Sequence, residues 1–159
     1  MIRRAMEPPD RQWIATAFDS WRRTRGWSLR GATPSPLTLD HLLAQDAVVR
    51  HVVVTAARPV ALFEVVGWSQ RNGFARLELM VEPECDDVAD ELQAFVSDVF
   101  TTKPDLRKLC VWSFEDEFDA ADVLGVTARQ VGRLVGHERR GIDRYVDVMV
   151  HEIWPPQAA

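Results

Sequence analysis

The segment from Leu77 to Phe95 most constrains the fold, because its pattern predicts a β-strand that runs directly into an α-helix. Strand-to-helix turns of this kind bind phosphate groups when glycines let backbone N–H groups converge and the local field is positive. This turn has the opposite chemistry. No glycine occurs between Gly73 and Gly125, and acidic residues fill the turn: Glu84, Asp86, Asp87 and Asp90.

The composition is that of an ordinary globular protein. The 159 residues are 47% hydrophobic and 27% charged, which predicts one domain over residues 1–159 with its own core. A net charge of −5 argues against a broad surface for nucleic acid. No run reaches the ~18 apolar residues that span a bilayer, so we expect a cytoplasmic protein without a membrane partner. Neither Cys85 and Cys110 nor the four histidines have metal-ligand spacing, and we predict no metal site.

The first third of the chain predicts a short strand and two helices. Ile2–Ala5 is the strand. Apolar residues at spacings of one, three and four predict an amphipathic helix over Asp10–Arg23. A second, shorter helix begins with Thr38 or Asp40 as its cap.

Three consecutive antiparallel strands follow. β-branched residues predict strands that start at Val52–Thr55 and continue through Val60–Trp68, with a tight turn at Arg58-Pro59. The hairpin signal Asn72-Gly73 then leads into Phe74–Glu82. In this third strand, alternate side chains point to opposite faces of the sheet.

The rest of the chain predicts a helix, a parallel strand and a closing hairpin. The helix stops near Lys103-Pro104, and the strand Lys108–Phe114 runs parallel to the strand before that helix. A short helix over Asp116–Leu124 precedes the hairpin of Arg129–His137 and Arg144–Trp154. The fold class is therefore α/β (α+β), with a mixed, mostly antiparallel sheet of about six or seven strands flanked by helices.

This order of elements resembles the GNAT N-acyltransferase fold over nearly the whole chain. The stretch Gly132–Val150 is similar to the last hairpin of the branch that acetylates ribosomal-protein N-termini, with its Gly-x-Leu, charged strand, small turn and Tyr/Asp-Val-x-Val strand. Leu124-Gly125-Val126 also resembles the Leu-Gly-Phe that ends the last helix of the family.

The resemblance implies an acyl-CoA site in a V-shaped opening between the fourth and fifth strands. Pantetheine would pair with the backbone of the fourth strand, and the pyrophosphate would lie on the following turn. The positions implied for these contacts are Leu79, Met80 and Val81 on the strand, and Asp86, Asp87 and Ala89 on the turn. Aspartates at a helix start accept its N–H groups themselves and repel phosphate, so we expect a degenerate pyrophosphate loop.

The resemblance also directs attention to the acid and base of the reaction. The family often has a tyrosine acid at the position of Ala121, and the single tyrosine of this chain is Tyr145. Glu78 and Glu82 project from the strand beside the opening, so either is a candidate base. Ser113 is a candidate hydrogen-bond donor to the leaving group. Each has an ordinary alternative, as a solvent-side carboxylate or a backbone-satisfying serine.

Candidate acceptor contacts lie at the end of the first helix and in the closing hairpin. His137 lies on a strand that borders the acceptor pocket in the resembled fold, where it is a candidate contact or base. Trp21 and Arg25 lie near the acceptor cleft of that fold and are candidate contacts for an acidic acceptor or an acyl carrier protein. The alternative role of Trp21 is to pack on the aromatic face of the first helix, and that of Arg25 is to lie at a solvated helix end.

Two functions follow from these patterns. One is an N-acyltransferase that moves an acyl group from acyl-CoA, or from a carrier-bound thioester with a single phosphate, to a small-molecule or peptide amine. The other is a catalytically inactive GNAT-fold protein, acting in binding or regulation within a homodimer. The acidic turn and the missing tyrosine favour the second.

Overall fold

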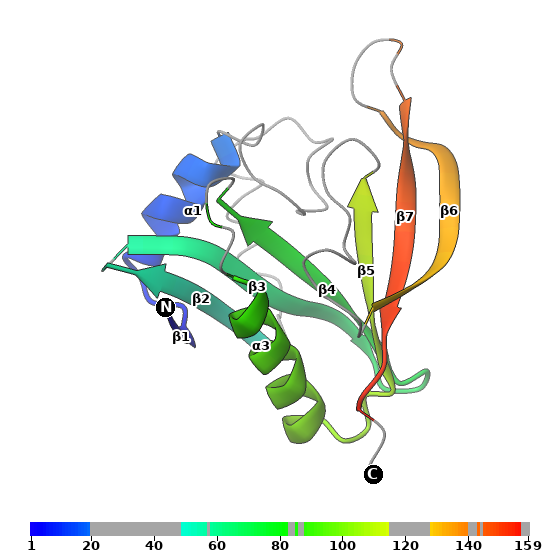
Figure 1. Ribbon diagram of the computed structural model, residues 1–159, viewed down its shortest axis with the longest axis horizontal. Coiled ribbons are helices and arrows are strands. Elements are labelled where there is room, and N and C mark those ends of the chain that lie inside the picture. Colours follow the sequence, from blue (N-terminus) through cyan, green and yellow to red (C-terminus); the bar gives the residue numbers. More distant parts are fainter. Residues whose placement is uncertain are drawn as a thin grey trace.

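The structure is a computed structural model that describes residues 1–19, 49–56, 58–82, 85, 88–114, 128–139, 143 and 145–156. Its described strands form one seven-stranded sheet in the order β1-β2-β3-β4-β5-β7-β6 (Figure 1). The elements are β1 Ile2–Ala5, α1 Asp10–Asp19, β2 Val49–Thr55, β3 Arg58–Ser69, β4 Phe74–Val81, α3 Ala89–Thr102, β5 Lys108–Phe114, β6 Ala128–Arg139 and β7 Tyr145–Ile153. The predicted fold class and the predicted antiparallel strands are confirmed.

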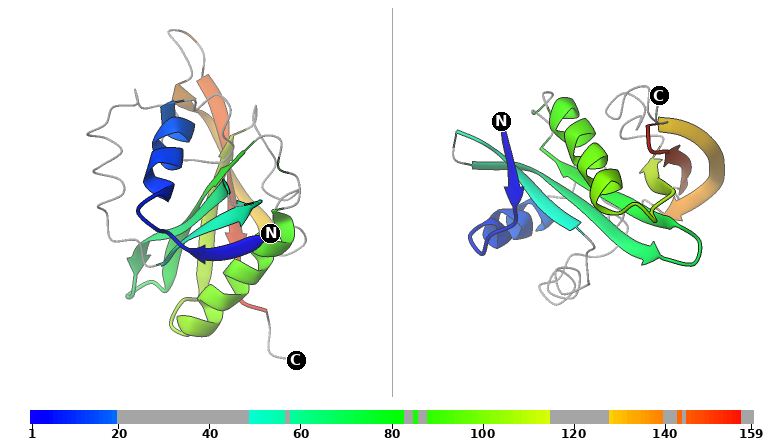
Figure 2. Two further views of the ribbon diagram at one scale, coloured as in Figure 1. Left: turned by 90° about the vertical axis from the view of Figure 1, so that its left-hand side faces the viewer. Right: turned by 90° about the horizontal axis from the view of Figure 1, so that it is seen from below.

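The two described helices cover opposite faces of the sheet (Figure 2). On the α3 face, Phe95 and Leu92 pack with Phe63 in the larger core cluster. On the α1 face, Ile14 packs with Leu62 and Met80. This division follows from the strand alternation, which sends Leu77, Leu79 and Val81 to the first face and Met80 to the second.

Every pair of described strands is antiparallel except β4 and β5, which are parallel as predicted. The crossover between them contains α3, whose start at Ala89 and end at Thr102 match the sequence pattern. The tight turn predicted at Arg58-Pro59 is wrong. Arg58 and Pro59 are the first residues of β3 and pair with β2, and the bend before them contains Ala56 at a φ of 45°. Proline is tolerated here because it is at a strand start.

Other sequence predictions lie outside the described residues. These are the first helix beyond Asp19, the helix expected after Thr38 and the helix over Asp116–Leu124. Within the described part of the chain, no helix is long and apolar enough to cross a membrane.

The turn before β4 also fixes the start of β5. Gly73 has a φ of +64°, and its carbonyl accepts hydrogen bonds from Arg107 N at 2.7 Å and Lys108 N at 3.2 Å. A Cβ at this position would lie 2.8 Å from Arg107 Cγ and 3.2 Å from the Asp105 carbonyl oxygen. The glycine therefore lets two distant segments of the chain approach closely where β4 and β5 begin.

Gly73→Ala is expected to destabilise the protein more than Gly67→Ala does. Both glycines have a φ of +64°, so both alanines carry about 1–2 kcal/mol of backbone strain. A Cβ on Gly67 meets nothing within 4 Å, whereas the one on Gly73 adds an overpacking cost of about 1–3 kcal/mol. Urea denaturation of the two variants measures the difference. Equal losses of unfolding free energy would contradict the close approach.

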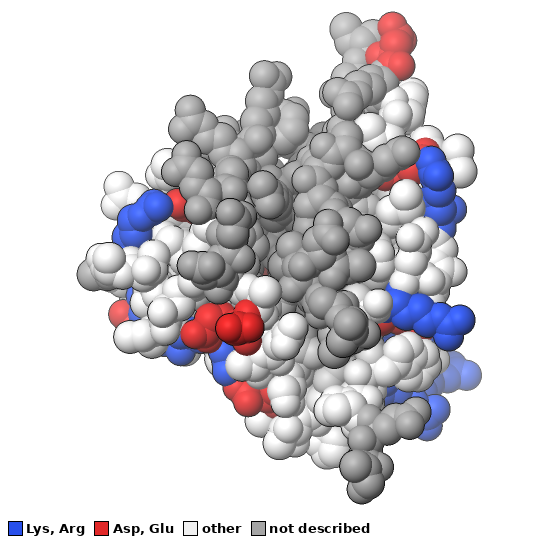
Figure 3. Space-filling view, viewed as in Figure 1, with Lys and Arg blue, Asp and Glu red and all other residues white. Residues whose placement is uncertain are grey.

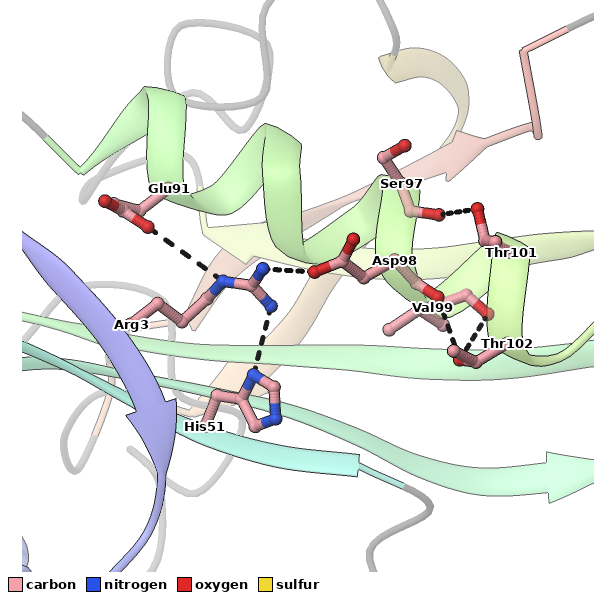
Figure 4. A network of polar contacts seen from close by, with 8 residues as sticks. All are labelled: Arg3, His51, Glu91, Ser97, Asp98, Val99, Thr101 and Thr102. Atoms are coloured by element: carbon pink, nitrogen blue, oxygen red, sulfur yellow. Dashed lines mark hydrogen bonds and ion pairs between the residues drawn. The ribbon is translucent and has the colours of Figure 1, made fainter.

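A polar network joins the N-terminal strand to α3 (Figure 4). Arg3 donates a hydrogen bond to His51 Nδ1 at 3.0 Å and forms ion pairs with Asp98 and with Glu91, the latter at 3.9 Å. The Arg3 guanidinium also lies 5.6 Å from the centroid of the Phe95 ring. Burial, and then the neighbouring arginine cation, lower the pKa of His51 below 6.5, while Asp98 opposes this shift.

This network predicts a loss of stability on mild acidification. Because the folded state binds the His51 proton less tightly than the unfolded state, the contribution of neutral His51 is complete above about pH 6.5 and falls as the pH drops below it. We expect His51→Gln, which keeps an acceptor but does not titrate, to reduce the drop in Tm between pH 7.5 and pH 5.5. His137→Gln, at an exposed histidine, is the control. An unchanged drop in His51→Gln would contradict this role.

Candidate functional site

The site is built around an opening between β4 and β5. The two strands pair over only three residues, and the last pair is Arg76 with Cys110. Beyond this pair the strands diverge, as Figure 1 shows for their arrowed ends. On the outer sides, β4 stays paired to β3 up to Val81, and β5 stays paired to β7 up to Phe114. The sheet therefore splits between β4 and β5, while each of the two strands remains paired with its outer neighbour.

Beyond Arg76, the outer backbone edge of β4 has no partner among the described strands. Glu82 N donates to Val60 O at 2.9 Å, and the β3–β4 register runs without a shift from there to Val66 and Arg76. Because successive residues of a strand alternate in direction, the N–H and C=O groups of Leu79 and Val81 point away from β3 and into the opening. The strand edge can therefore pair with an extended amide chain such as pantetheine.

Ser113 lies on the other side of the opening. Its side chain is on the α3 face of β5 with Leu109 and Val111, and the residue is 1% exposed. Its Oγ has no hydrogen-bond partner among the described residues. A buried hydroxyl without a partner is costly, and such atoms need an explanation. A ligand atom in the opening would supply the missing partner.

A row of charged side chains, of which the two glutamates are buried, crosses the opposite face of the sheet. Glu64 on β3 lies directly across from Glu78 on β4, and Arg50 on β2 lies across from Glu64. Arg50 forms an ion pair with Glu64, and Arg76 forms one with Glu78. Both glutamates are about 5% exposed, at 6% for Glu64 and 5% for Glu78. Burial raises the pKa of Glu64 above 4.5, and the Arg50 charge opposes this rise.

Glu82, the other predicted base, is held by structural contacts. Trp13 of α1 donates its Nε1–H to Glu82 Oε1 at 3.0 Å. Arg58 approaches the same carboxylate at 2.8 and 3.1 Å. These contacts join the end of β4 to α1 and to the start of β3, so they favour a packing role for Glu82 and leave Glu78 as the better placed candidate.

A groove lies on the α1 face beside Arg76, at one end of the charged row. Its volume is about 340 Å³, and its walls are mainly apolar with the Arg76 side chain among them. The Arg76 guanidinium lies 5.9 Å from the centroid of the Trp112 ring. The ring of His137 approaches the edge of Trp112 with centroids 6.1 Å apart. His137 is exposed, and through Trp112 it borders the same groove.

The end of the opening near α3 is acidic. The first turn of α3 carries Asp90 and Glu91, and its N-cap residue Val88 provides no side-chain hydrogen bond. Figure 3 shows Asp and Glu side chains gathered over this start of the helix. Ala89 is the first helical residue. Asp86 and Asp87 lie outside the described residues, as do Trp21 and Arg25.

Sequence reasoning missed several members of the site. Glu64 was detectable as the one charged residue within the apolar run Val60–Val66. Arg76 and Trp112 gave no such signal, because an arginine or tryptophan on a strand is common. Their meeting depends on the parallel register of β4 and β5. Among the described residues, no group of three or more His, Cys, Asp or Glu is arranged to hold a metal ion.

Two solved structures that match this chain over nearly its whole length are acetyltransferases. A spermidine N-acetyltransferase from Vibrio cholerae, in complex with CoA and spermine, matches with a TM-score of 0.76 at 19% identity, over 96% of this chain and 94% of that one. The chain has the GNAT fold. An acetyltransferase of the GNAT family from Streptococcus pneumoniae matches with a TM-score of 0.73 at 12% identity, over 98% and 99% of the two chains.

At these low sequence identities, the structural similarity establishes the GNAT fold alone, and the activity is argued from the site. No family model matches the sequence, and no curated protein matches it.

Proposed function

We propose that this protein is an N-acyltransferase that moves an acyl group from a thioester to an amine by direct attack in the opening between β4 and β5. The observation that carries the proposal is the split between β4 and β5 itself: within the described part of the chain, the outer edge of β4 beyond Arg76 has no strand partner, and the Ser113 hydroxyl has no hydrogen-bond partner. The structural neighbours are acetyltransferases, and one is a complex with CoA, which supports the same class of donor.

The donor is held through its pantetheine. The backbone of Leu79 and Val81 fits the amides of that arm, and Met80 packs between them on the opposite face against α1. The start of α3 does not fit a diphosphate, because Asp90 and Glu91 occupy its first turn. Asp86 and Asp87 add two more negative charges in the sequence just before it. The nucleotide end of CoA therefore contributes little, and a carrier-bound donor with a single phosphate is equally suited.

The acid and base act from opposite faces of the sheet. Glu78 lies on the same side of β4 as Met80, which packs against α1. Ser113 lies on the same side of β5 as Leu109 and Val111, which pack against α3. An acceptor that enters from the α1 face therefore meets a carboxylate, and the thioester sulfur lies toward Ser113. In this arrangement the amine attacks one face of the thioester carbonyl, and the thiolate is released toward Ser113.

The chemical step is a simple substitution at the acyl carbon. The acceptor ammonium loses one proton to Glu78, and its nitrogen lone pair then attacks the thioester carbonyl. The N–C bond forms, the C–S bond breaks, and the sulfur leaves with the bonding electrons. The second nitrogen proton neutralises the thiolate, while Ser113 donates a hydrogen bond to it. The products are an amide, a thiol and one proton released to solvent through Glu78.

The alternative function is a GNAT-fold binding protein that turns over no thioester. The acidic first turn of α3 favours it, because that charge opposes an ordinary CoA site. Exposed Val131, Val135 and Tyr145 on the last two strands provide apolar surface for a second copy in a homodimer.

The proposed donor site predicts that S-acetylpantetheine binds nearly as well as acetyl-CoA. If the diphosphate and nucleotide contribute little, the two dissociation constants differ by less than about tenfold, or 1.4 kcal/mol. Melting temperatures measured over a concentration series of each compound give both constants. A response to acetyl-CoA alone would show that the diphosphate is bound after all. No response to either thioester would support the inactive alternative.

Three substitutions separate the catalytic assignments. Glu78→Gln is expected to slow acyl transfer by about 10²–10⁴-fold, the usual contribution of a general base. Ser113→Ala is expected to slow transfer without loss of stability, because it removes a buried hydroxyl that has no described partner. Glu82→Gln is expected to lower Tm while retaining the rate, since Glu82 holds Trp13 and Arg58. The reverse result for the two glutamates would transfer the base role to Glu82.

A further inference from the structure

The groove on the α1 face combines features that specify an acceptor. Its apolar walls come from four elements and include Val66, Phe74, Cys110, Trp112 and Val150. At about 340 Å³ it lies at the small end of the range for small-molecule sites, roughly 300–1,000 Å³. A peptide or an extended polyamine would therefore leave most of its length outside, while a single compact apolar group fits within.

One cation also belongs to this groove. The Arg76 side chain is 41% exposed, lines the groove, and lies against the Trp112 ring. An arginine held against an aromatic face keeps its fork of N–H donors fixed in orientation, which suits a planar carboxylate. A ligand with an anionic group beside its apolar part is therefore matched better than a plain amine.

The carboxylate of Glu78, next to Arg76, is the third feature that specifies the acceptor. Arg76 and Glu78 are in ion-pair contact, so their charged ends lie next to each other. The ammonium and carboxylate groups of an α-amino acid are equally close, because both are attached to one carbon. Glu64, directly across from Glu78, is paired with Arg50, so Glu78 is the carboxylate of the row that lies next to Arg76 and the groove.

We propose that the acceptor is an α-amino acid with an apolar side chain. Its carboxylate binds Arg76, its ammonium group lies at Glu78, and its side chain occupies the groove beside Trp112. This inference rests on the proposed function, since it identifies the acceptor of the same acyl transfer. It assigns Arg76 as the residue that determines specificity for a carboxylate, and the groove as the determinant for the side chain.

Binding of four compounds to the unaltered protein, without any acyl donor, tests the acceptor class. Isothermal titration calorimetry would compare L-phenylalanine with 2-phenylethylamine, which lacks the carboxylate, with glycine, which lacks the side chain, and with spermidine, which lacks both. We expect L-phenylalanine to bind at least tenfold more tightly than each of the others. Equal or tighter binding of 2-phenylethylamine or spermidine, or no binding of L-phenylalanine, would overturn the inference.

The preference for L-phenylalanine over 2-phenylethylamine also tests the role of Arg76. Arg76→Gln is expected to remove the advantage of L-phenylalanine over 2-phenylethylamine, while Arg71→Gln, at an exposed arginine of the β3–β4 turn, retains it. A general loss of packing would weaken both ligands together, so a retained preference in Arg76→Gln overturns the assignment.

Failure of this inference and failure of the proposed function give different results. If another amine is acylated when a thioester is supplied, the transferase stands and only the acceptor class is wrong. If L-phenylalanine binds but no thioester does, the groove is an amino-acid site on a protein without acyl transfer.

Discussion

The short parallel contact between β4 and β5 is the constraint on which the site depends. Three residue pairs hold the strands together at their beginnings, and the carbonyl of Gly73 anchors the backbone at the start of β5. Beyond these pairs, β4 stays paired with β3 and β5 stays paired with β7, so the two strands separate. Because a split sheet leaves backbone donors and acceptors without strand partners, it is an unfavourable arrangement unless another chain or ligand satisfies them. The opening is thus a consequence of topology more than of any single side chain.

The charged row on the α1 face is difficult to explain by stability alone. Burying each of the two carboxylates costs several kcal/mol before its arginine partner offsets the cost, and two carboxylates directly opposite each other on neighbouring strands repel. Arg50 and Arg76 make the arrangement tolerable, and burial still raises the pKa of Glu64. Apolar residues at these positions would extend the core formed by Leu62 and Met80. A function at the sheet surface is the simpler reason for a charged row there.

The fold was predictable because its signals are local. Alternation in Phe74–Val81, helical spacing in Ala89–Thr102 and the turn at Gly73 each depend on a few neighbouring residues. The parallel pairing of β4 with β5 followed from the intervening helix, since such a crossover brings two strands side by side in parallel. The bend before β3 was misplaced because Pro59, which suggested a turn, is also tolerated near the start of a strand.

The site was predictable only in part. Glu78 and Ser113 were predicted to lie beside the opening because each is on a strand whose alternation gives its direction, and their catalytic roles stay predictions. The groove was not found, since Arg76, Trp112 and Val150 come together through register between strands that are distant in sequence. The interpretation of Glu82 also needed the structure, because its partners Trp13 and Arg58 are on other elements.

Amide hydrogen exchange along β4 tests most directly whether the opening binds a thioester donor. The N–H groups of Leu79 and Val81 point into the opening, whereas those of Glu78 and Met80 point toward β3 and serve as internal controls. With saturating S-acetylpantetheine, we predict slower exchange at Leu79 and Val81 and little change at the two controls. Unchanged exchange at Leu79 and Val81, under conditions in which the compound raises the melting temperature, would place the donor elsewhere and contradict the account.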